Sequence, residues 1–172
     1  MIAKAKAISH GINDIRYITG ESHNKKHPEK IYRVLDNMIP SEPDAMGVWN
    51  SMQLTLSRFR PVKNSVIRIE LSPSSEHTKD FTIEDWQKLW QDFSTEFDKQ
   101  VFKDKDGKIR NCPTNLANSK YTVWLHMESN SGVPHLHAAV CRMDEDGQIN
   151  NDHNIHLRAQ WAAERVAKKR GW

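Results

Sequence analysis

Three histidines in the C-terminal half of the chain have the spacing of a metal site. His135 and His137 are two residues apart in a segment that alternates like a strand, so both imidazoles leave the same face. His126 lies on the preceding predicted strand, across a turn that contains Gly132. An even number of loop residues puts His126 on that face too, opposite either His135 or His137. Since neutral imidazoles bind divalent metals, the three side chains predict a metal site with positions open for water or a phosphate oxygen.

The alternative interpretation is the solvated face of an antiparallel sheet that carries histidines without using them. It accounts for one His-x-His pair but not for three imidazoles that can converge. A further pair, His153 and His156, lies at the start of a predicted helix and is interpreted as solvated. The two cysteines, Cys112 and Cys141, have no metal-ligand spacing and are predicted to be reduced thiols.

The elements that position the histidines follow from the alternation of apolar and polar residues. Strands are predicted at residues 1–9, 65–72, 121–128 and 134–143, and helices at 10–18, 44–59, 81–101 and 156–170. Thr82 and Asp85 predict a capping box at the start of the third helix. The predicted fold is α+β, with a central antiparallel sheet of four to five strands, helices on one face and the metal site on the other.

Two long connections are expected between these elements. Residues 19–43 contain three prolines and many cations, and we expect a basic, mobile excursion with one short helix or strand. Residues 103–119 are expected to form a turn-rich loop. The Asp-Lys-Asp-Gly sequence at 104–107 resembles the start of a calcium loop, but the later acidic ligands are missing.

The face of the sheet that carries the histidines is predicted to be polar throughout. On the strands at 1–9 and 65–72, polar residues alternate with alanine or aliphatic residues. Besides the histidines, this face is predicted to carry Lys4, Lys6, Arg68, Glu70, Ser72 and Trp124. Cations and an aromatic ring beside a metal site favour a polyanionic ligand that lies across the sheet.

The composition limits the class of protein. The 172 residues have a formal charge of +3, with 37% hydrophobic and 27% charged residues, which is typical of a folded domain. No apolar run approaches the ~20 residues that span a bilayer, and the first residues lack the apolar h-region of a signal peptide. We therefore expect one cytoplasmic domain over residues 1–172, with no membrane partner, that folds without needing a metal or a disulfide.

The order of motifs resembles that of a known family. The pattern of His126 followed by Pro134-His135-Leu136-His137 resembles the third motif of the HUH endonucleases, and in particular of conjugative relaxases of the MobA-like mobilisation family. The first strand with Ser9-His10-Gly11 and a helix bearing Tyr17 resembles that family's first motif. The strand ending in Leu71-Ser72-Pro73-Ser74 resembles its second motif, which contacts the DNA backbone.

The resemblance implies a relaxase, an enzyme that nicks one strand of plasmid or transposon DNA at an origin of transfer. It implies that Tyr17 attacks the scissile phosphate to form a 5′-phosphotyrosyl bond, and that the three histidines hold Mg²⁺ or Mn²⁺. Glu70 is implied to orient a ligand imidazole or to take a proton. The implied partners are single-stranded origin DNA and accessory mobilisation proteins. The implied DNA contacts are Lys4, Lys6, Arg16, Arg68, Ser72 and Trp124.

Several alternatives stay open on the sequence alone. Many relaxases carry paired tyrosines, whereas Tyr17 stands alone and Tyr32 follows at some distance. Some mobilisation relaxases are thought to use a histidine nucleophile, and His10 is close to Tyr17. The rival functions are an HUH replication initiator or transposase, another metal-dependent hydrolase, and a non-catalytic DNA-binding module. Relaxases usually continue beyond the nuclease domain, so residues 1–172 could be a piece of a longer protein.

Overall fold

The structure is a computed structural model, and it describes residues 1–22, 30–127 and 132–172. The N-terminal half contains β1 (Ile2–Ile8), α1 (Gly11–Ile18), β2 (Ile31–Asn37), α2 (Ala45–Phe59), β3 (Val66–Ser72) and α3 (Ser75–Thr78). The C-terminal half contains α4 (Ile83–Asp98), the short 3₁₀ helix η2 (Leu116–Asn118), β4 (Tyr121–His126), β5 (His135–Cys141) and α5 (Ile155–Arg170). Most of the predicted turn between the histidine strands, and part of the predicted basic excursion, lie outside the described residues.

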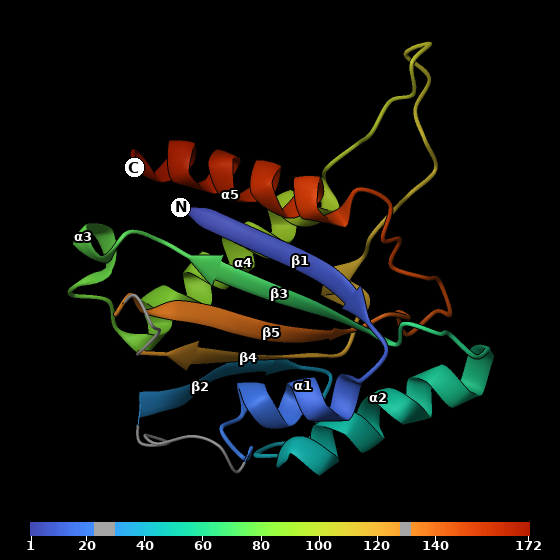
Figure 1. Cartoon of the computed structure of the whole chain (residues 1–172), viewed down its shortest axis with the longest axis horizontal. Coiled ribbons are helices and arrows are strands. Elements are labelled where there is room, and N and C mark those ends of the chain that lie inside the picture. The colour runs from blue at the N-terminus through green and yellow to red at the C-terminus, as the bar shows by residue number, and fades with distance from the viewer. Residues whose placement is uncertain (23–29, 128–131) are drawn as a thin grey trace.

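The five strands form one antiparallel sheet in the order β1-β3-β5-β4-β2 (Figure 1). This confirms the predicted α+β fold, and the short element expected within residues 19–43, a helix or a strand, is the strand β2. The middle strand is β5, which carries His135 and His137, and β4 with His126 lies beside it. The candidate metal ligands therefore come from the centre of the sheet, where the backbone is hydrogen-bonded on both sides.

The first face of the sheet packs against α4 and α5. Every second residue of β3 is fully buried there, together with Trp90 and Phe93 of α4. Thr82 and Asp85 form the predicted capping box that starts α4: the Asp85 amide donates to Thr82 Oγ1, and the Thr82 amide donates to Asp85 Oδ2. Small residues share this core where α5 meets β1, namely Ala3, Ala5, Ala159, Ala162 and Ala163.

The second face is polar at one end and apolar at the other. Along β5 its residues are His135, His137, Ala139 and Cys141 in turn, because side chains alternate along a strand. Ala139 and Cys141 are fully buried in a second core with residues of α1 and α2, among them Ile15, Ile18, Val48 and Met52.

The prediction of helices on one face therefore holds for α4 and α5 but is incomplete. The isoleucines of α1 need an apolar surface, and the small residues of β5 provide one on the second face. As a result α1 ends beside the histidines.

Cys112 and Cys141 are both buried and are free thiols. Within the described ranges, no helix is long and apolar enough to cross a membrane.

Candidate active site

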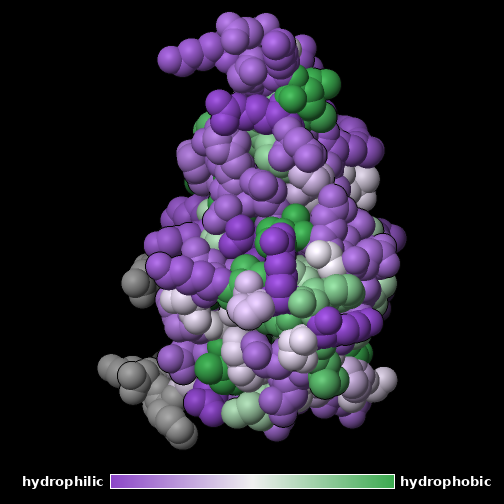
Figure 2. Space-filling view, turned by 90° about the vertical axis from the view of Figure 1, so that its right-hand side faces the viewer, coloured by the Kyte–Doolittle hydropathy of each residue, from purple (hydrophilic) through white to green (hydrophobic). Residues whose placement is uncertain are grey.

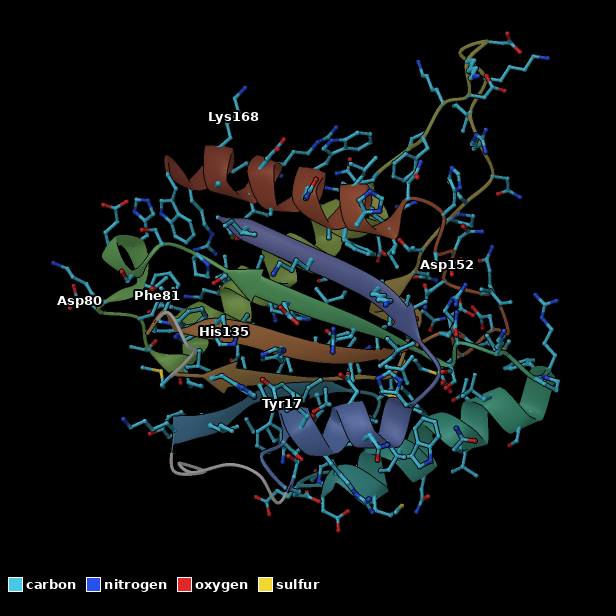
Figure 3. All side chains as sticks on the ribbon, in the orientation of Figure 1. Tyr17, Asp80, Phe81, His135, Asp152 and Lys168 are labelled. Carbon is cyan, nitrogen blue, oxygen red and sulfur yellow. The ribbon has the colours of Figure 1, made fainter. Side chains whose placement is uncertain are left out.

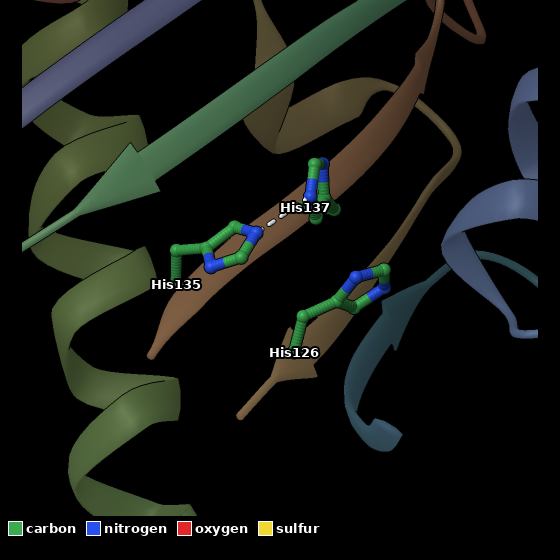
Figure 4. Close-up of side chains that lie close together, drawn as sticks. All are labelled: His126, His135 and His137. Atoms are coloured by element: carbon green, nitrogen blue, oxygen red, sulfur yellow. Dashed lines mark hydrogen bonds between the residues drawn. The ribbon is translucent and has the colours of Figure 1, made fainter. Parts of the chain in front are cut away.

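The strand register decides how the three histidines meet. His126 pairs with His135, and Trp124 pairs with His137, which is one of the two registers that the sequence allows. The imidazoles gather on the second face of the sheet (Figure 4), with one ring nitrogen from each within 4.8 Å of the others. His126 and His137 are each only 3% exposed, while His135 is half-buried. Two ligands are thus held in the protein interior and the third faces the solvent side.

In two of the histidines, a backbone carbonyl determines which ring nitrogen carries the proton. Nε2 of His126 lies 2.8 Å from the carbonyl oxygen of Ile18, and Nδ1 of His135 lies 2.9 Å from that of Val133. A carbonyl oxygen only accepts, so each of these nitrogens is an N–H donor. A neutral His126 then has its lone pair on Nδ1, and a neutral His135 has its lone pair on Nε2. Hydrogen bonds of this kind orient the imidazole ligands in metal sites.

The third contact tests whether a cation fits. Nε2 of His135 and Nε2 of His137 are 2.9 Å apart (dashed in Figure 4). Without an ion, His137 must donate a hydrogen bond to the lone pair of His135. With an ion, both lone pairs point at it, and two nitrogens bound at right angles ~2.1 Å from one metal lie about 3 Å apart. The donor set and its spacing therefore fit a divalent cation held by His126, His135 and His137.

Tyr17 lies over this cluster. Its ring centroid is 5.7 Å from that of His126 and 5.5 Å from that of His137. The residue that follows it, Ile18, is fully buried and supplies the carbonyl that binds His126. Figure 3 shows Tyr17 at the end of α1 that lies nearer to His135. The Tyr17 side chain is still 44% exposed, so a ligand approaching the histidines from solvent can reach it.

The two other candidate nucleophiles lie elsewhere. His10 is the residue before α1, and Tyr17 follows it by seven positions, which is about 10 Å along the helix axis. Tyr32 pairs with Leu125, and Leu125 is buried in the core of the first face. Because paired residues point to the same face, Tyr32 projects on the side of the sheet away from the histidines.

A row of polar and aromatic side chains crosses all five strands and includes His137. Strand pairing aligns Lys4 with Glu70, Glu70 with His137, His137 with Trp124, and Trp124 with Arg33. Arg33 was not among the residues predicted from sequence, because its strand could not be placed without the pairing of β2 to β4. Trp124 is half-buried against the second core, and its indole N–H donates to Thr122 Oγ1 at 2.8 Å.

At the β1 side of this row lies a cavity of about 220 Å³, lined by Lys4, Ala5, Lys6, Arg68 and Glu70. Lys4 and Lys6 are exposed and Arg68 is partly exposed. The sheet register therefore brings three of the six predicted DNA contacts together. Of the others, Arg16 is exposed on α1 and Ser72 is the half-buried last residue of β3.

Sequence reasoning also missed a buried carboxylate in this region. Asp14 of α1 is 4% exposed, and its Oδ1 lies 3.4 Å from an Nη1 donor of Arg68. Its second oxygen, Oδ2, is buried without a hydrogen-bond partner among the described residues. Burial raises the pKa of Asp14, and the charge of Arg68 partly offsets this effect. Only the packing of α1 onto β3 reveals this pair, since nothing local marks Asp14.

Comparison with solved structures identifies proteins of similar fold. Two structures of the conjugative relaxase TrwC in complex with oriT DNA, one metal-bound and one copper-bound, match with TM-scores of 0.52 and 0.50. The sequence identities are 12% and 11%, and each match covers 99% of this chain and 71% of the other. No family model and no curated protein matches the sequence. The chain therefore has the fold of a conjugative relaxase, a likeness that holds over nearly its whole length.

Proposed function

We propose that this protein is a relaxase-type DNA strand transferase whose nucleophile is Tyr17. The observation that carries the proposal is the placement of Tyr17 directly over His126 and His137. A phosphate that contacts these histidines through a metal would lie within reach of the tyrosine hydroxyl. A fold match alone would not support a reaction, whereas a nucleophile and a ligand cluster on one face do.

The proposed reaction exchanges one phosphodiester bond for another. The Tyr17 oxygen attacks the phosphorus, the bond from phosphorus to O3′ breaks, and a 5′-phosphotyrosyl bond forms. The tyrosine proton leaves and the O3′ atom gains one, so the strand ends in a free 3′-hydroxyl. A divalent cation bound by the histidines would withdraw charge from the phosphate oxygens. Glu70, which pairs with His137 in the sheet, is proposed to orient that imidazole or to accept the proton.

The substrate is proposed to be a single strand that lies across the sheet. The row from Lys4 to Arg33 runs at right angles to the strands, and the cavity beside it is lined by Lys4, Lys6 and Arg68. Cations in a groove beside an aromatic side chain are the usual means of binding single-stranded DNA. We expect Arg16 and Ser72 to contact the backbone and Trp124 to contact a base.

The biological substrate is proposed to be an origin of transfer. The structural neighbours are a conjugative relaxase in complex with oriT DNA, which supports this choice of substrate. Membership of the MobA-like mobilisation family, accessory mobilisation proteins, a cytoplasmic location and the preference for Mg²⁺ or Mn²⁺ stay predictions. A replication initiator of the HUH class, which more often has its tyrosine after the His-x-His, is less favoured because α5 contains no tyrosine.

The proposal is tested with labelled single-stranded oligonucleotides from a panel of plasmid origins of transfer. We expect a slowly migrating protein–DNA adduct on a denaturing gel in Mn²⁺, and none when a chelator is present. Binding without cleavage across the whole panel, by protein shown to be metal-loaded, would indicate a non-catalytic DNA-binding module instead.

A further inference from the structure

Five side chains form a closed ring that links α1 to the sheet beside the histidines. Tyr17 lies over His137, with 5.5 Å between the ring centroids, and His137 pairs with Glu70 of β3. The Nε atom of Arg68 lies 3.7 Å from Glu70 Oε1, and its Nη1 atom lies 3.4 Å from Asp14 Oδ1. Asp14 and Tyr17 are three residues apart on α1, so they are neighbours on its surface. We call Asp14, Arg68 and Glu70 the bridge.

The bridge joins two elements through a single guanidinium. Asp14 belongs to α1 and its side chain is only 2% exposed, whereas Arg68 and Glu70 belong to β3 and are partly exposed. A guanidinium offers five N–H donors in a rigid plane, so it can contact carboxylates on two elements at once. One cation thus faces two anions, and the charge of Arg68 is matched within the protein.

Other cations on the surface do not have such partners. Lys4 and Lys6 line the same cavity as Arg68, yet they form no ion pair with any residue that the structure describes. The exposed Lys105 and Lys108 belong to the hairpin of residues 101–111, whose projection is largely hydrophilic at the top of Figure 2. Within the described residues they are unpaired as well. Arg68 is therefore engaged in a way that cations open to a phosphate are not.

Apolar packing alone does not define how α1 is rotated. The isoleucines of α1 pack on small residues of β5 in the second core, and hydrophobic contact is non-directional. Two polar contacts supply the direction. The Ile18 carbonyl lies 2.8 Å from Nε2 of His126, and one turn earlier Asp14 contacts Arg68. These contacts come just before and just after Tyr17 along the helix.

The bridge is not explained by a need to stabilise the fold. Burial raises the pKa of Asp14 in spite of the charge of Arg68, so the folded state disfavours the ionised carboxylate. Oδ2 of Asp14 is buried without a hydrogen-bond partner among the described residues, which adds to this penalty. At neutral pH a buried carboxylate of this kind weakens the fold, and its contact with β3 therefore calls for another role.

We infer that Asp14 and Arg68 are positioning residues for Tyr17, which with Glu70 set the rotation of α1 that places the tyrosine over His137. The inference rests on the proposed function, in which Tyr17 is the nucleophile. Reacting groups must be aligned, and a misplacement of about 1 Å can cost ~100-fold in rate. Arg68 then acts through Tyr17 and Glu70, a different role from the phosphate contact that the sequence resemblance implies.

The position of Tyr17 can be measured without DNA or metal. The chain contains three tyrosines, so protein labelled with meta-fluorotyrosine should give three ¹⁹F NMR signals, and Tyr17→Phe identifies one of them. We expect the Tyr17 signal to move and broaden in Asp14→Asn and in Arg68→Gln. The signals of Tyr32, on the other side of the sheet, and of the buried Tyr121 should stay in place.

A matched control is available on the first face of the sheet. Arg165 of α5 lies 3.8 Å from a carboxylate oxygen of the buried Glu96, so Arg165→Gln also removes an arginine that is paired with a buried acid. We expect this variant to leave all three signals and the rate of adduct formation unchanged.

The rate of adduct formation shows whether the bridge matters for the reaction. At saturating oligonucleotide and Mn²⁺ we expect Asp14→Asn and Arg68→Gln to react ~10- to 100-fold more slowly, with nearly unaltered DNA affinity and salt slope. The double variant should be no slower than the slower single variant. Arg68→Lys should also be slow, because an ammonium lacks the planar fork that contacts two carboxylates.

Several results would overturn the inference. An unchanged Tyr17 signal with an unchanged rate would show that α1 does not need the bridge. A salt slope lower by ~0.7 in Arg68→Gln, with normal reaction in Arg68→Lys, would make Arg68 a phosphate contact. A rate that falls only in parallel with the melting temperature would mean that the bridge merely holds the fold. If the unaltered protein forms no adduct, the proposed function fails, while the NMR signals still decide whether the bridge positions Tyr17.

Discussion

The ring of Tyr17 stands nearly perpendicular to the imidazole of His137, at an interplanar angle of 87° and a centroid distance of 5.5 Å. This relationship joins the first helix to the middle strand of the sheet, across 120 residues of sequence. It is fixed from the helix side by the buried Ile18, whose carbonyl accepts from His126. The proposed nucleophile and two candidate metal ligands therefore share one rigid unit, which is the arrangement that in-line attack on a bound phosphate would require.

The metal site is tested by removing one ligand. In His137→Ala the cation would keep only two imidazoles. Loss of a residue that merely hydrogen-bonds to a metal ligand typically lowers metal affinity ~10–100-fold. Since His137 is itself a candidate ligand, we expect the affinity for Mn²⁺ to fall by more than this. Isothermal titration calorimetry measures this directly. His77→Ala is the control, because His77 stacks on Trp172 and is no member of the cluster. Unchanged Mn²⁺ affinity in His137→Ala would show that the histidines do not form the site.

The buried carboxylate of Asp14 predicts a pH dependence of stability. Burial raises its pKa above the ordinary value of 3.8, so the folded state holds the proton more tightly than the unfolded state. The stability that this group contributes is greatest below 3.8 and is lost as the pH rises through the folded pKa. In Asp14→Asn this loss cannot occur.

The free energy of unfolding of Asp14→Asn, relative to the unaltered protein, should therefore increase from acid to neutral pH. Urea titrations at several pH values measure it. A relative stability that decreases over this range would mean that Arg68 stabilises the charged carboxylate by more than burial penalises it.

The atoms around Gly11 leave no room for a side chain, so a substitution there tests how closely α1 packs against its neighbours. A Cβ at this position would lie 2.4 Å from a ring carbon of Trp49 and 2.6 Å from a methyl group of Val66. We expect Gly11→Ala to destabilise the protein by about 1–3 kcal/mol, as overpacked cores do, and to slow adduct formation because α1 carries Tyr17. Thermal unfolding and the adduct assay check both effects, with the exposed neighbour Ser9→Ala as control. Wild-type stability in Gly11→Ala would show that α1 can shift without loss.

The lysines of β1 predict a salt-dependent affinity for single strands. Changing Lys4 and Lys6 to Gln removes two cations from the cavity beside the histidines. The slope of log affinity against log salt should fall by about 1 to 1.5, since each phosphate contact on a single strand contributes ~0.7. Fluorescence anisotropy with a labelled oligonucleotide measures the slope. The same change at Lys63 and Lys88 should leave it nearly unaltered, and equal slopes in both variants would rule out this surface as the DNA path.

The parts of the structure predicted from sequence are those that local patterns determine. Alternation on β3 and β5 separates the face of His135 and His137 from the apolar face, because side-chain direction depends only on position along a strand. The capping box of Thr82 and Asp85 is likewise a matter of four consecutive residues. The meeting of His126 with the other two follows from one short hairpin, although two registers were possible.

The features that were missed depend on contacts between distant segments. The packing of α1 and α2 on the second face, the pairing of Asp14 with Arg68, and the place of Arg33 in the row across the sheet all need the sheet order to be known first. The projection of the hairpin at residues 101–111 (Figure 1, upper right) was missed for another reason. Its turn sequence is similar to that of residues 143–149, but Glu145 and Asp146 of that second turn accept hydrogen bonds from Thr55 and Asn118 of the body.

The identity of the nucleophile is tested most directly by mapping the DNA adduct onto the chain. Trypsin cleaves after Lys6, Arg16, Lys25, Lys30 and Arg33, so it separates the three candidates into different peptides. After reaction with the origin oligonucleotide in Mn²⁺ and nuclease trimming, mass spectrometry should find the added nucleotide on the peptide of residues 17–25, with fragment ions that place it on Tyr17. Tyr17→Phe should yield no adduct while binding DNA normally. An adduct on the peptide of residues 7–16, which contains His10, or on the peptide of residues 31–33, which contains Tyr32, would contradict the assignment.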